Sequence, residues 1–322
     1  MQIPIKRTLE RVPGGMMLIP LLLGAIIKTW FPSVIKLPSF TGGLMTGAIP
    51  ILAVFFFCMG ANISLKAAPK AVARGGAFLV TKILLATGVG IFIAHFTSSG
   101  IILGISALAF IAAMNDTNAG MYCALMSEYG SSEDVGAYSL QSLESGPFFT
   151  MVALGASGLA KIPVTDLIAA IGPMVLGFIA GNLDHELRDF LYSASKPLIP
   201  FFAFALGCGI DFHNIINAGP SGLLLGLFTL IITGGGLFIV DRFFKGTGVA
   251  GVAAATTAGN AVATPLAVAM ADPSFKAIQA TATAQVAASV IVTAILVPIV
   301  TATLAKYKGK DNTAAMTQAT AK

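Results

Sequence analysis

AAMNDTNAGMYCALMS, residues 112–127, decides the fold of this chain. An otherwise apolar run, residues 101–126, is interrupted here by four consecutive polar residues: Asn115, Asp116, Thr117 and Asn118. A run of that length is typical of a helix buried in a membrane, where a carboxylate beside two amides is costly unless it is paired or functional. The stretch therefore indicates a transport site inside a membrane protein.

The composition agrees with a chain surrounded by lipid. Of the 322 residues, 56% are hydrophobic and only 10% are charged, whereas soluble proteins carry about 25% charged residues. The net charge of +5 comes from basic residues scattered over loops and ends, so it does not predict nucleic-acid binding. Three isolated cysteines and three distant histidines predict neither a disulfide nor a metal site. No GxxxxGK[ST] motif is present, so ATP does not drive the expected transport.

Hydropathy predicts an all-α membrane protein with ten transmembrane helices of about 20 residues each. The first five are expected at residues 14–31, 43–61, 76–96, 101–127 and 137–160. The second five are expected at residues 165–182, 196–210, 219–241, 248–271 and 276–305. The fourth and ninth spans are expected to be broken, at residues 114–119 and 257–265. The polar segment 307–322 is expected to be a disordered tail.

The distribution of basic residues predicts the orientation. With the N-terminus inside, fourteen Lys and Arg residues, Lys66 among them, lie in cytoplasmic segments. Four lie in outer segments: Lys28, Lys36, Lys161 and Lys276. Because Lys and Arg collect on the cytoplasmic side, both termini are expected to be cytoplasmic.

The two halves of the chain, residues 1–163 and 164–306, resemble each other. IPILAVFFFCMGA (49–61) corresponds to IPFFAFALGCGID (199–211), and Gln141 and Ser145 align with Gln285 and Ser289. Five spans in each half is an odd number, so the halves enter the membrane in opposite senses. This predicts two inverted five-helix repeats, with the broken fourth and ninth helices crossing near the membrane midplane.

The second break has no acidic residue. Its stretch AAATTAGNAVATPLAVAM, residues 253–270, offers neutral groups instead: Thr257, Asn260 and Thr264, with Pro265 preventing a continuous helix. The N-terminal ends of two half-helices directed at one cavity form a positive pocket suited to an anion, even without an Arg. A hydroxylated small acid fits such a pocket, and an apolar drug or lipid has no use for these groups.

Two carboxylates are candidates for proton coupling, Asp116 and Glu144. A desolvated carboxylate that is neutralised near neutral pH is what a proton-coupled carrier requires. For Asp116 the structural alternative is that it caps the second half-helix. Glu144 shares one helical face with Gln141 and Ser145, and its structural alternative is a hydrogen-bonded pair with an amide or with Lys82. The candidate substrate-binding residues are Asn115, Thr117, Asn118, Gln141, Ser145, Thr257, Asn260, Thr264 and Gln285.

Lys82 is the one basic residue well inside a predicted span. Its position about two turns from the end of the third span favours snorkelling to the membrane surface. The alternative is that it serves as the counter-ion of Glu144 or of a substrate carboxylate.

Several stretches together resemble the bacterial 2-keto-3-deoxygluconate permeases, over residues 10–306. They are PGGMMLIPLLLGA (13–25), NDTNAGMY (115–122), SLESGP (142–147), GNLDHELRDF (181–190), LIPFFAFALG (198–207) and AGNAVATP (258–265). The resemblance implies an inner-membrane carrier that imports 2-dehydro-3-deoxy-D-gluconate by proton symport, with an architecture similar to the bile acid/sodium symporters. It also implies that spans three to five and eight to ten form a core domain and the other spans a panel. Glu144, within SLESGP, then ranks level with Asp116.

The expected function is therefore secondary transport by alternating access, with no cofactor, no metal and no enzymatic activity. An intramembrane aspartyl protease would need two membrane aspartates, and only Asp116 lies well inside a predicted span. Sodium coupling remains the alternative, because Asn115, Thr117, Gln141, Glu144 and Asn260 offer hard oxygen ligands to Na⁺. A passive channel is the other alternative, and it would not accumulate its substrate. The expected partners are a small sugar acid and membrane lipids, and a homo-oligomer is left open.

Overall fold

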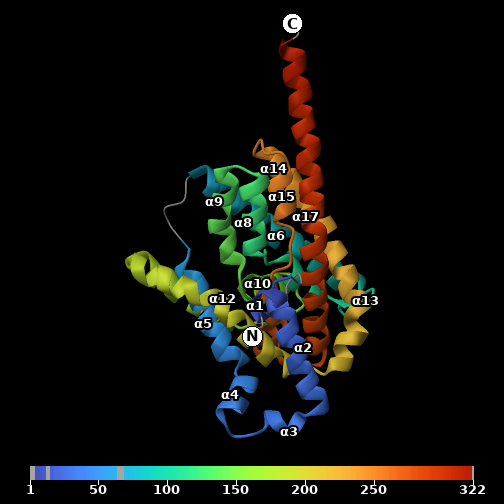
Figure 1. Ribbon diagram of the computed structural model, residues 1–322. Coiled ribbons are helices and arrows are strands. Elements are labelled where there is room, and N and C mark those ends of the chain that lie inside the picture. Colours follow the sequence, from blue (N-terminus) through green and yellow to red (C-terminus); the bar gives the residue numbers. More distant parts are fainter. Residues whose placement is uncertain (1–3, 12–14, 64–68, 321–322) are drawn as a thin grey trace.

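The computed structural model describes residues 4–11, 15–63 and 69–320 as an almost wholly helical molecule (Figure 1). Lys66, counted above among the cytoplasmic residues, lies outside the described residues. The first half contains α1 (Ile5–Leu9), α2 (Gly15–Trp30), α3 (Pro32–Ile35), α4 (Phe40–Thr46), α5 (Ala48–Ala61), α6 (Pro69–Phe96), β1 (Ile101–Ile102), β2 (Ile105–Ser106), α7 (Ala107–Met114), α8 (Ala119–Tyr129), α9 (Ser132–Gln141), the 3₁₀ helix η1 (Ser142–Glu144) and α10 (Phe148–Ala156). The second half contains α11 (Val164–Leu183), α12 (His185–Gly207), α13 (Phe212–Phe228), the π-helix η2 (Thr229–Thr233), α14 (Gly234–Phe243), α15 (Val249–Ala253), the 3₁₀ helix η3 (Gly259–Ala263), α16 (Thr264–Ala271), the 3₁₀ helix η4 (Pro273–Phe275) and α17 (Lys276–Thr320).

Several helices are long and apolar enough to cross a membrane, so the chain is a multi-pass membrane protein. Among the described residues they are Pro69–Phe96, Val164–Leu183, His185–Gly207, Ala218–Phe243 and Pro273–Tyr307. The pair α4 and α5, bent by 68°, is a sixth if it is taken as one span. The other predicted spans coincide with α2, which is only 16 residues long, and with three helices that are interrupted.

The helices pack in two groups. In the first group α2 packs against α12, and α5 packs against both α11 and α12. The contacts are close because glycines face backbone: a Cβ atom at Gly207 would lie 2.0 Å from the Leu21 carbonyl oxygen, and one at Gly177 would lie 1.9 Å from that of Phe57. Small residues at such positions let membrane helices approach each other. The second group contains α6 against α9 and α14, and α13 and α15 against α17.

Two predicted spans differ from the structure. Residues 101–106 form a small antiparallel hairpin, β1 with β2, instead of the start of the fourth helix. Leu103 and Gly104, at its turn, both have positive φ, which a helix excludes. The fifth span, predicted to be continuous, is interrupted after η1, where Gly146 has a φ of 106° and Pro147 has no N–H to donate.

The tail also differs from the expectation. The sequence predicts disorder after residue 306, and the structure continues α17 as a helix to Thr320. Figure 1 shows α17 in red, running along the molecule and extending beyond the other helices.

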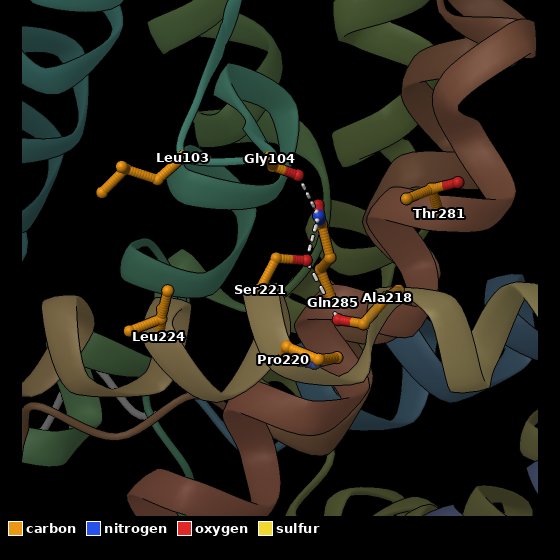
Figure 2. A pocket seen from close by; sticks show the side chains of 8 residues that line it. All are labelled: Leu103, Gly104, Ala218, Pro220, Ser221, Leu224, Thr281 and Gln285. Carbon is orange, nitrogen blue, oxygen red and sulfur yellow. Dashed lines mark hydrogen bonds between the residues drawn. The ribbon is translucent and has the colours of Figure 1, made fainter.

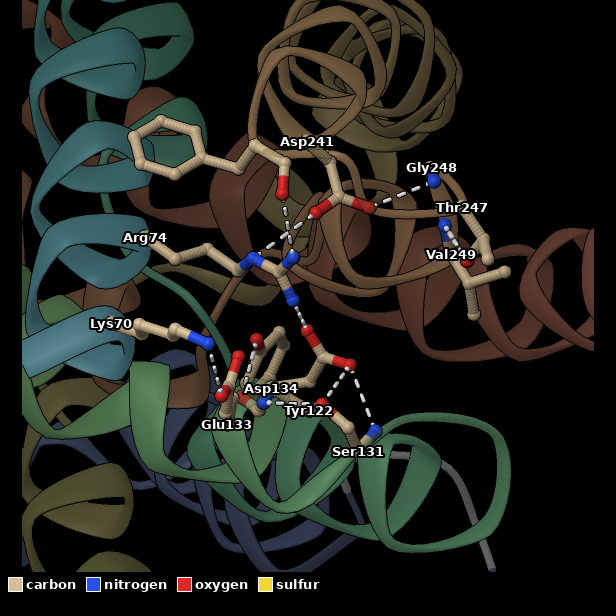
Figure 3. Close-up of polar contacts among 11 residues, drawn as sticks. Lys70, Arg74, Tyr122, Ser131, Glu133, Asp134, Asp241, Thr247, Gly248 and Val249 are labelled. Carbon is tan, nitrogen blue, oxygen red and sulfur yellow. Dashed lines mark hydrogen bonds and ion pairs between the residues drawn. The ribbon is translucent and has the colours of Figure 1, made fainter. Parts of the chain in front are cut away.

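A polar cluster ties together the ends of four elements in the second group (Figure 3). Arg74 of α6 forms ion pairs with Asp134 of α9 and, at 3.5 Å, with Asp241 of α14. Asp134 also completes a capping box with Ser131 at the start of α9. The Asp241 carboxylate accepts from the Gly248 amide at 2.8 Å, just before α15. The cluster therefore fixes this end of the second group as one unit.

Candidate functional site

The first break lies between α7 and α8, where the sequence predicts it. Asn118 caps α8, because its side-chain oxygen accepts from the Met121 amide at 3.1 Å. Asp116 is therefore not the cap, and its buried side chain is left for other contacts. Asn115 is 2% exposed, and within the described residues neither polar atom of its side chain has a hydrogen-bond partner.

The two breaks cross each other and are joined by reciprocal hydrogen bonds. We call residues 115–118 together with residues 254–260 the crossing. Thr117 Oγ1 donates to the Ala254 carbonyl at 3.1 Å, and Thr257 Oγ1 donates to the Ala113 carbonyl, also at 3.1 Å. The Ala258 amide donates to the Asp116 carbonyl at 3.0 Å. Backbone freed by each break is thus satisfied by the other break, as non-helical backbone inside a membrane protein requires.

Three charged side chains lie at the first break: Lys82, Glu144 and Asp116. Lys82 is fully buried, and its Nζ atom lies 2.9 Å from Glu144 Oε1 and 2.6 Å from Thr117 Oγ1. The Thr117 amide donates to the same Glu144 oxygen at 2.6 Å. Lys82 therefore does not snorkel but forms the counter-ion of Glu144, the second of the two interpretations that the sequence allowed.

Asp116 has a different partner. Its Oδ2 atom accepts from the amide of Asn260, which belongs to η3 at the second break. Its Oδ1 atom is buried and has no hydrogen-bond partner among the described residues. Two buried carboxylates thus lie at the first break: Glu144, which is paired with Lys82, and Asp116, which forms no ion pair among the described residues.

The second break, which has no charged side chain, is hydrogen-bonded to α17. The Thr257 amide donates to Thr293 Oγ1 at 3.0 Å, and Thr257 Oγ1 lies 2.7 Å from Ser289 Oγ. Sequence reasoning did not include Ser289 and Thr293 in the site. Their signal was their spacing of four residues on one face of a buried helix, in line with Gln285.

The structure brings most of the predicted residues to the crossing, but not all of them. Gln141 and Ser145 lie in the buried turn on either side of η1, and Thr264 begins α16. Gln285 lies away from the crossing. It lines a cavity of about 340 Å³ between α13, α17 and the 101–106 hairpin (Figure 2). Its amide nitrogen donates to the Gly104 carbonyl at 2.7 Å and to Ser221 Oγ at 2.8 Å. Gln285 thus fixes the hairpin to α13.

A cavity of about 320 Å³ lies between the two helix groups. Its walls come from α5 and α11 on one side and from α10 and α16 on the other. Most of the lining is apolar, and Asp166 is its one charged residue. Phe56 and Pro147 belong to the lining, and Phe56 also packs beside Gly146, which follows Glu144 by two residues. The cavity therefore lies at the boundary of the two groups and close to the crossing along the chain, since Ala263 of its lining follows Asn260 by three residues.

The described residues contain no group of three or more His, Cys, Asp or Glu side chains that would hold a metal ion. Cys58, Cys123 and Cys208 are free.

Polar crossing, bordering cavity and several spanning helices define the class: a membrane transport protein. A family profile described as 2-keto-3-deoxygluconate permease matches residues 6–310. The chain is 50% identical over 310 residues to 2-keto-3-deoxygluconate permease 1 of Salmonella typhimurium, covering 95% of this chain and 97% of the relative. It is 51% identical over 309 residues to the 2-keto-3-deoxygluconate permease of Xanthomonas axonopodis pv. citri, covering 94% and 97%. The chain belongs to the 2-keto-3-deoxygluconate permease family, and it is a transporter and not an enzyme.

Proposed function

We propose that the protein imports 2-keto-3-deoxygluconate across the bacterial inner membrane by proton symport, through alternating access. The observation that carries this proposal is the crossing: two interrupted helices, buried among apolar residues, hold charged and polar groups beside a cavity. Interrupted helices that meet in this way are typical of secondary transporters. The names of the relatives supply the substrate.

Reciprocal packing supports ten spans in two inverted repeats. In this arrangement α2 corresponds to α11, and α5 corresponds to α12. The pair α2 and α12 and the pair α11 and α5 are then equivalent, and both pairs pack closely. The first helix group is the panel, the second is the core, and both termini are cytoplasmic.

The substrate site is formed by donors at and near the crossing. A sugar acid carries one carboxylate and several hydroxyls, which need donors and acceptors in a water-poor place. Asn115 offers a buried amide whose atoms have no other partner among the described residues. The N-terminal ends of α8 and α16 add a positive potential that favours the carboxylate. The cavity of about 320 Å³ is of the size that small-molecule sites have.

The charges at the crossing support coupling to one proton. Glu144 is compensated by Lys82, whereas Asp116, bonded to the Asn260 amide, forms no ion pair among the described residues. The empty site therefore carries one uncompensated negative charge, on Asp116. We assign the coupling proton to Asp116, with Glu144 held in its ion pair. Sodium coupling is the weaker alternative, since the Thr117 hydroxyl and the Oε1 atom of Glu144, two of the oxygens that would bind Na⁺, already bind the Lys82 ammonium.

Uptake by purified protein in proteoliposomes tests this proposal. We expect accumulation of labelled 2-keto-3-deoxygluconate when the outside is more acidic, in choline buffers without sodium. Unlabelled hexonates and other ketodeoxy acids, added in excess, rank the substrate specificity. Uptake that only equilibrates the substrate would identify a passive channel, and uptake that requires sodium would refute proton coupling.

A further inference from the structure

Lys82 lies at the middle of a long membrane helix, far from either end. It is the fourteenth residue of α6, which has 28 residues, and its side chain is 0% exposed. A buried ammonium without compensation is strongly unfavourable. Its presence at this depth therefore requires a built site that replaces water around the charge.

The site that surrounds the ammonium is made of hard oxygen atoms from the first break and from η1. Thr117 Oγ1 lies at 2.6 Å and Glu144 Oε1 at 2.9 Å from Nζ. The second Glu144 oxygen is buried and has no hydrogen-bond partner among the described residues. Carboxylate and hydroxyl oxygens are also what small inorganic cations prefer. The arrangement is therefore a cation site whose occupant is covalently part of the chain.

The same site holds the crossing together. The Thr117 hydroxyl accepts a hydrogen bond from the Lys82 ammonium. The same hydroxyl donates to the Ala254 carbonyl of the second break. Glu144 binds both the ammonium and the Thr117 amide. Removal of the positive charge would leave Glu144 buried and unpaired at the point where the two breaks meet.

We propose that the Lys82 ammonium is a tethered replacement for an inorganic cation: it occupies a monovalent-cation site formed by Thr117 and Glu144. The wild-type protein consequently binds no sodium at the crossing. A variant that lacks the ammonium exposes a vacant, negatively charged oxygen site, which Na⁺ fills. The uptake arm of the test rests on the proposed transport function, whereas the binding arm does not.

Thermal melting of purified protein, with NaCl titrated against choline chloride at constant ionic strength, tests the binding arm. We expect Lys82→Met to gain at least about 3 °C in melting temperature on saturation with Na⁺. The wild type should show no such gain. The double variant Lys82→Met with Glu144→Gln should also show none, because its site has no charge to attract the ion. Lys70→Met is the matched control: Lys70 pairs with Glu133 at 3.6 Å and its side chain is 82% exposed.

The uptake arm uses the same variants in proteoliposomes. We expect Lys82→Met to take up labelled 2-keto-3-deoxygluconate about tenfold faster in sodium than in choline, and the wild type to be indifferent. A Na⁺-induced gain in the wild type, or no gain in Lys82→Met, would overturn the proposal. If Lys82→Met cannot be recovered from the membrane, the wild-type titration still tests the proposal, because a Na⁺-induced gain in its melting temperature would overturn it. Failure of wild-type uptake would instead refute the proposed function, with the melting result unaffected.

Discussion

Asp116→Asn is the substitution that most directly probes the proposed coupling. The change removes a charge and hardly changes the shape. The hydrogen bond with Asn260 is kept, because an asparagine oxygen accepts from the Asn260 amide as Asp116 Oδ2 does. Glu144 keeps its ion pair with Lys82. The variant therefore tests the charge of one carboxylate without dismantling the crossing.

The expected magnitude follows from the charges at the site. One uncompensated carboxylate binds one proton, and the substrate carries one negative charge. The pair that crosses the membrane is then neutral, and a gradient of one pH unit supports about tenfold accumulation, equal to about 1.4 kcal/mol. In Asp116→Asn no proton accompanies the substrate, so the inside concentration should not respond to the pH gradient.

The assay is uptake into proteoliposomes at several pH gradients, with the membrane potential set to zero by potassium and valinomycin. Asp189→Asn is the matched control, since the Asp189 side chain is 80% exposed, pairs with the neighbouring Arg188 at 3.5 Å and belongs to α12, outside the lining of either cavity. It should retain tenfold accumulation per pH unit. If Asp116→Asn also retains it, Asp116 does not carry the proton and the assignment is wrong.

Three further substitutions test the scaffold of the site. Thr257→Val keeps the side-chain shape but removes a hydroxyl that bonds both α7 and α17, so it should cost about 1–3 kcal/mol in unfolding free energy; an unchanged melting temperature would contradict this. Gly146→Ala should lower uptake and stability, because its φ is 106° and a Cβ atom would lie 3.2 Å from the Phe56 ring; wild-type uptake would show that the turn adapts. The Lys161 amide, donating to Asp272, lowers the pKa of that carboxyl, so its stabilising effect is present above its unfolded pKa of about 3.9 and lost as the pH falls through the folded value. Asp272→Asn should accordingly lower the melting temperature at pH 7 but have little effect below pH 3, and an equal effect at both would refute the linkage.

Polar interruption of long apolar runs was the part of the fold most easily predicted. The break at residues 115–118 is visible because four polar residues in succession have no other explanation within lipid. Breaks made by backbone conformation were harder to see. Gly146 and Pro147 follow a helix-like polar face, and the sequence alone does not say that Gly146 takes a positive φ. The hairpin at residues 101–106 is equally apolar as a strand or a helix, so hydropathy does not distinguish them.

At the site, residue types were predicted better than their pairings. Asp116, Thr117, Asn260 and Thr257 all lie at the crossing, as their positions in the two breaks indicated. The partner of Lys82 was not decided, because snorkelling and pairing depend on which way one face of α6 points. That direction is set by packing of α6 against α9, a contact that no local pattern encodes. Gln285, which aligns with Gln141 in the two halves, lies at the cavity beside the 101–106 hairpin, and its role as a substrate ligand stays a prediction.

Under the proposed proton symport, the distribution of charge over the two breaks explains why the described residues place a buried ion pair, Lys82 with Glu144, at the first break and none at the second. In the proposed mechanism reorientation moves the crossing through a low-dielectric region, where any difference in net charge between the empty and the loaded carrier would couple the transport cycle to the membrane potential. With Lys82 and Glu144 paired, the empty site carries one negative charge on Asp116. The loaded site carries one negative charge on the substrate, because Asp116 is then protonated. Both states therefore move the same charge, so their reorientation contributes nothing net over a cycle, and the pH gradient alone drives accumulation. At the second break the bonded groups are neutral hydroxyls, from Thr257, Ser289 and Thr293. The second break therefore adds no charge to the empty or to the loaded carrier.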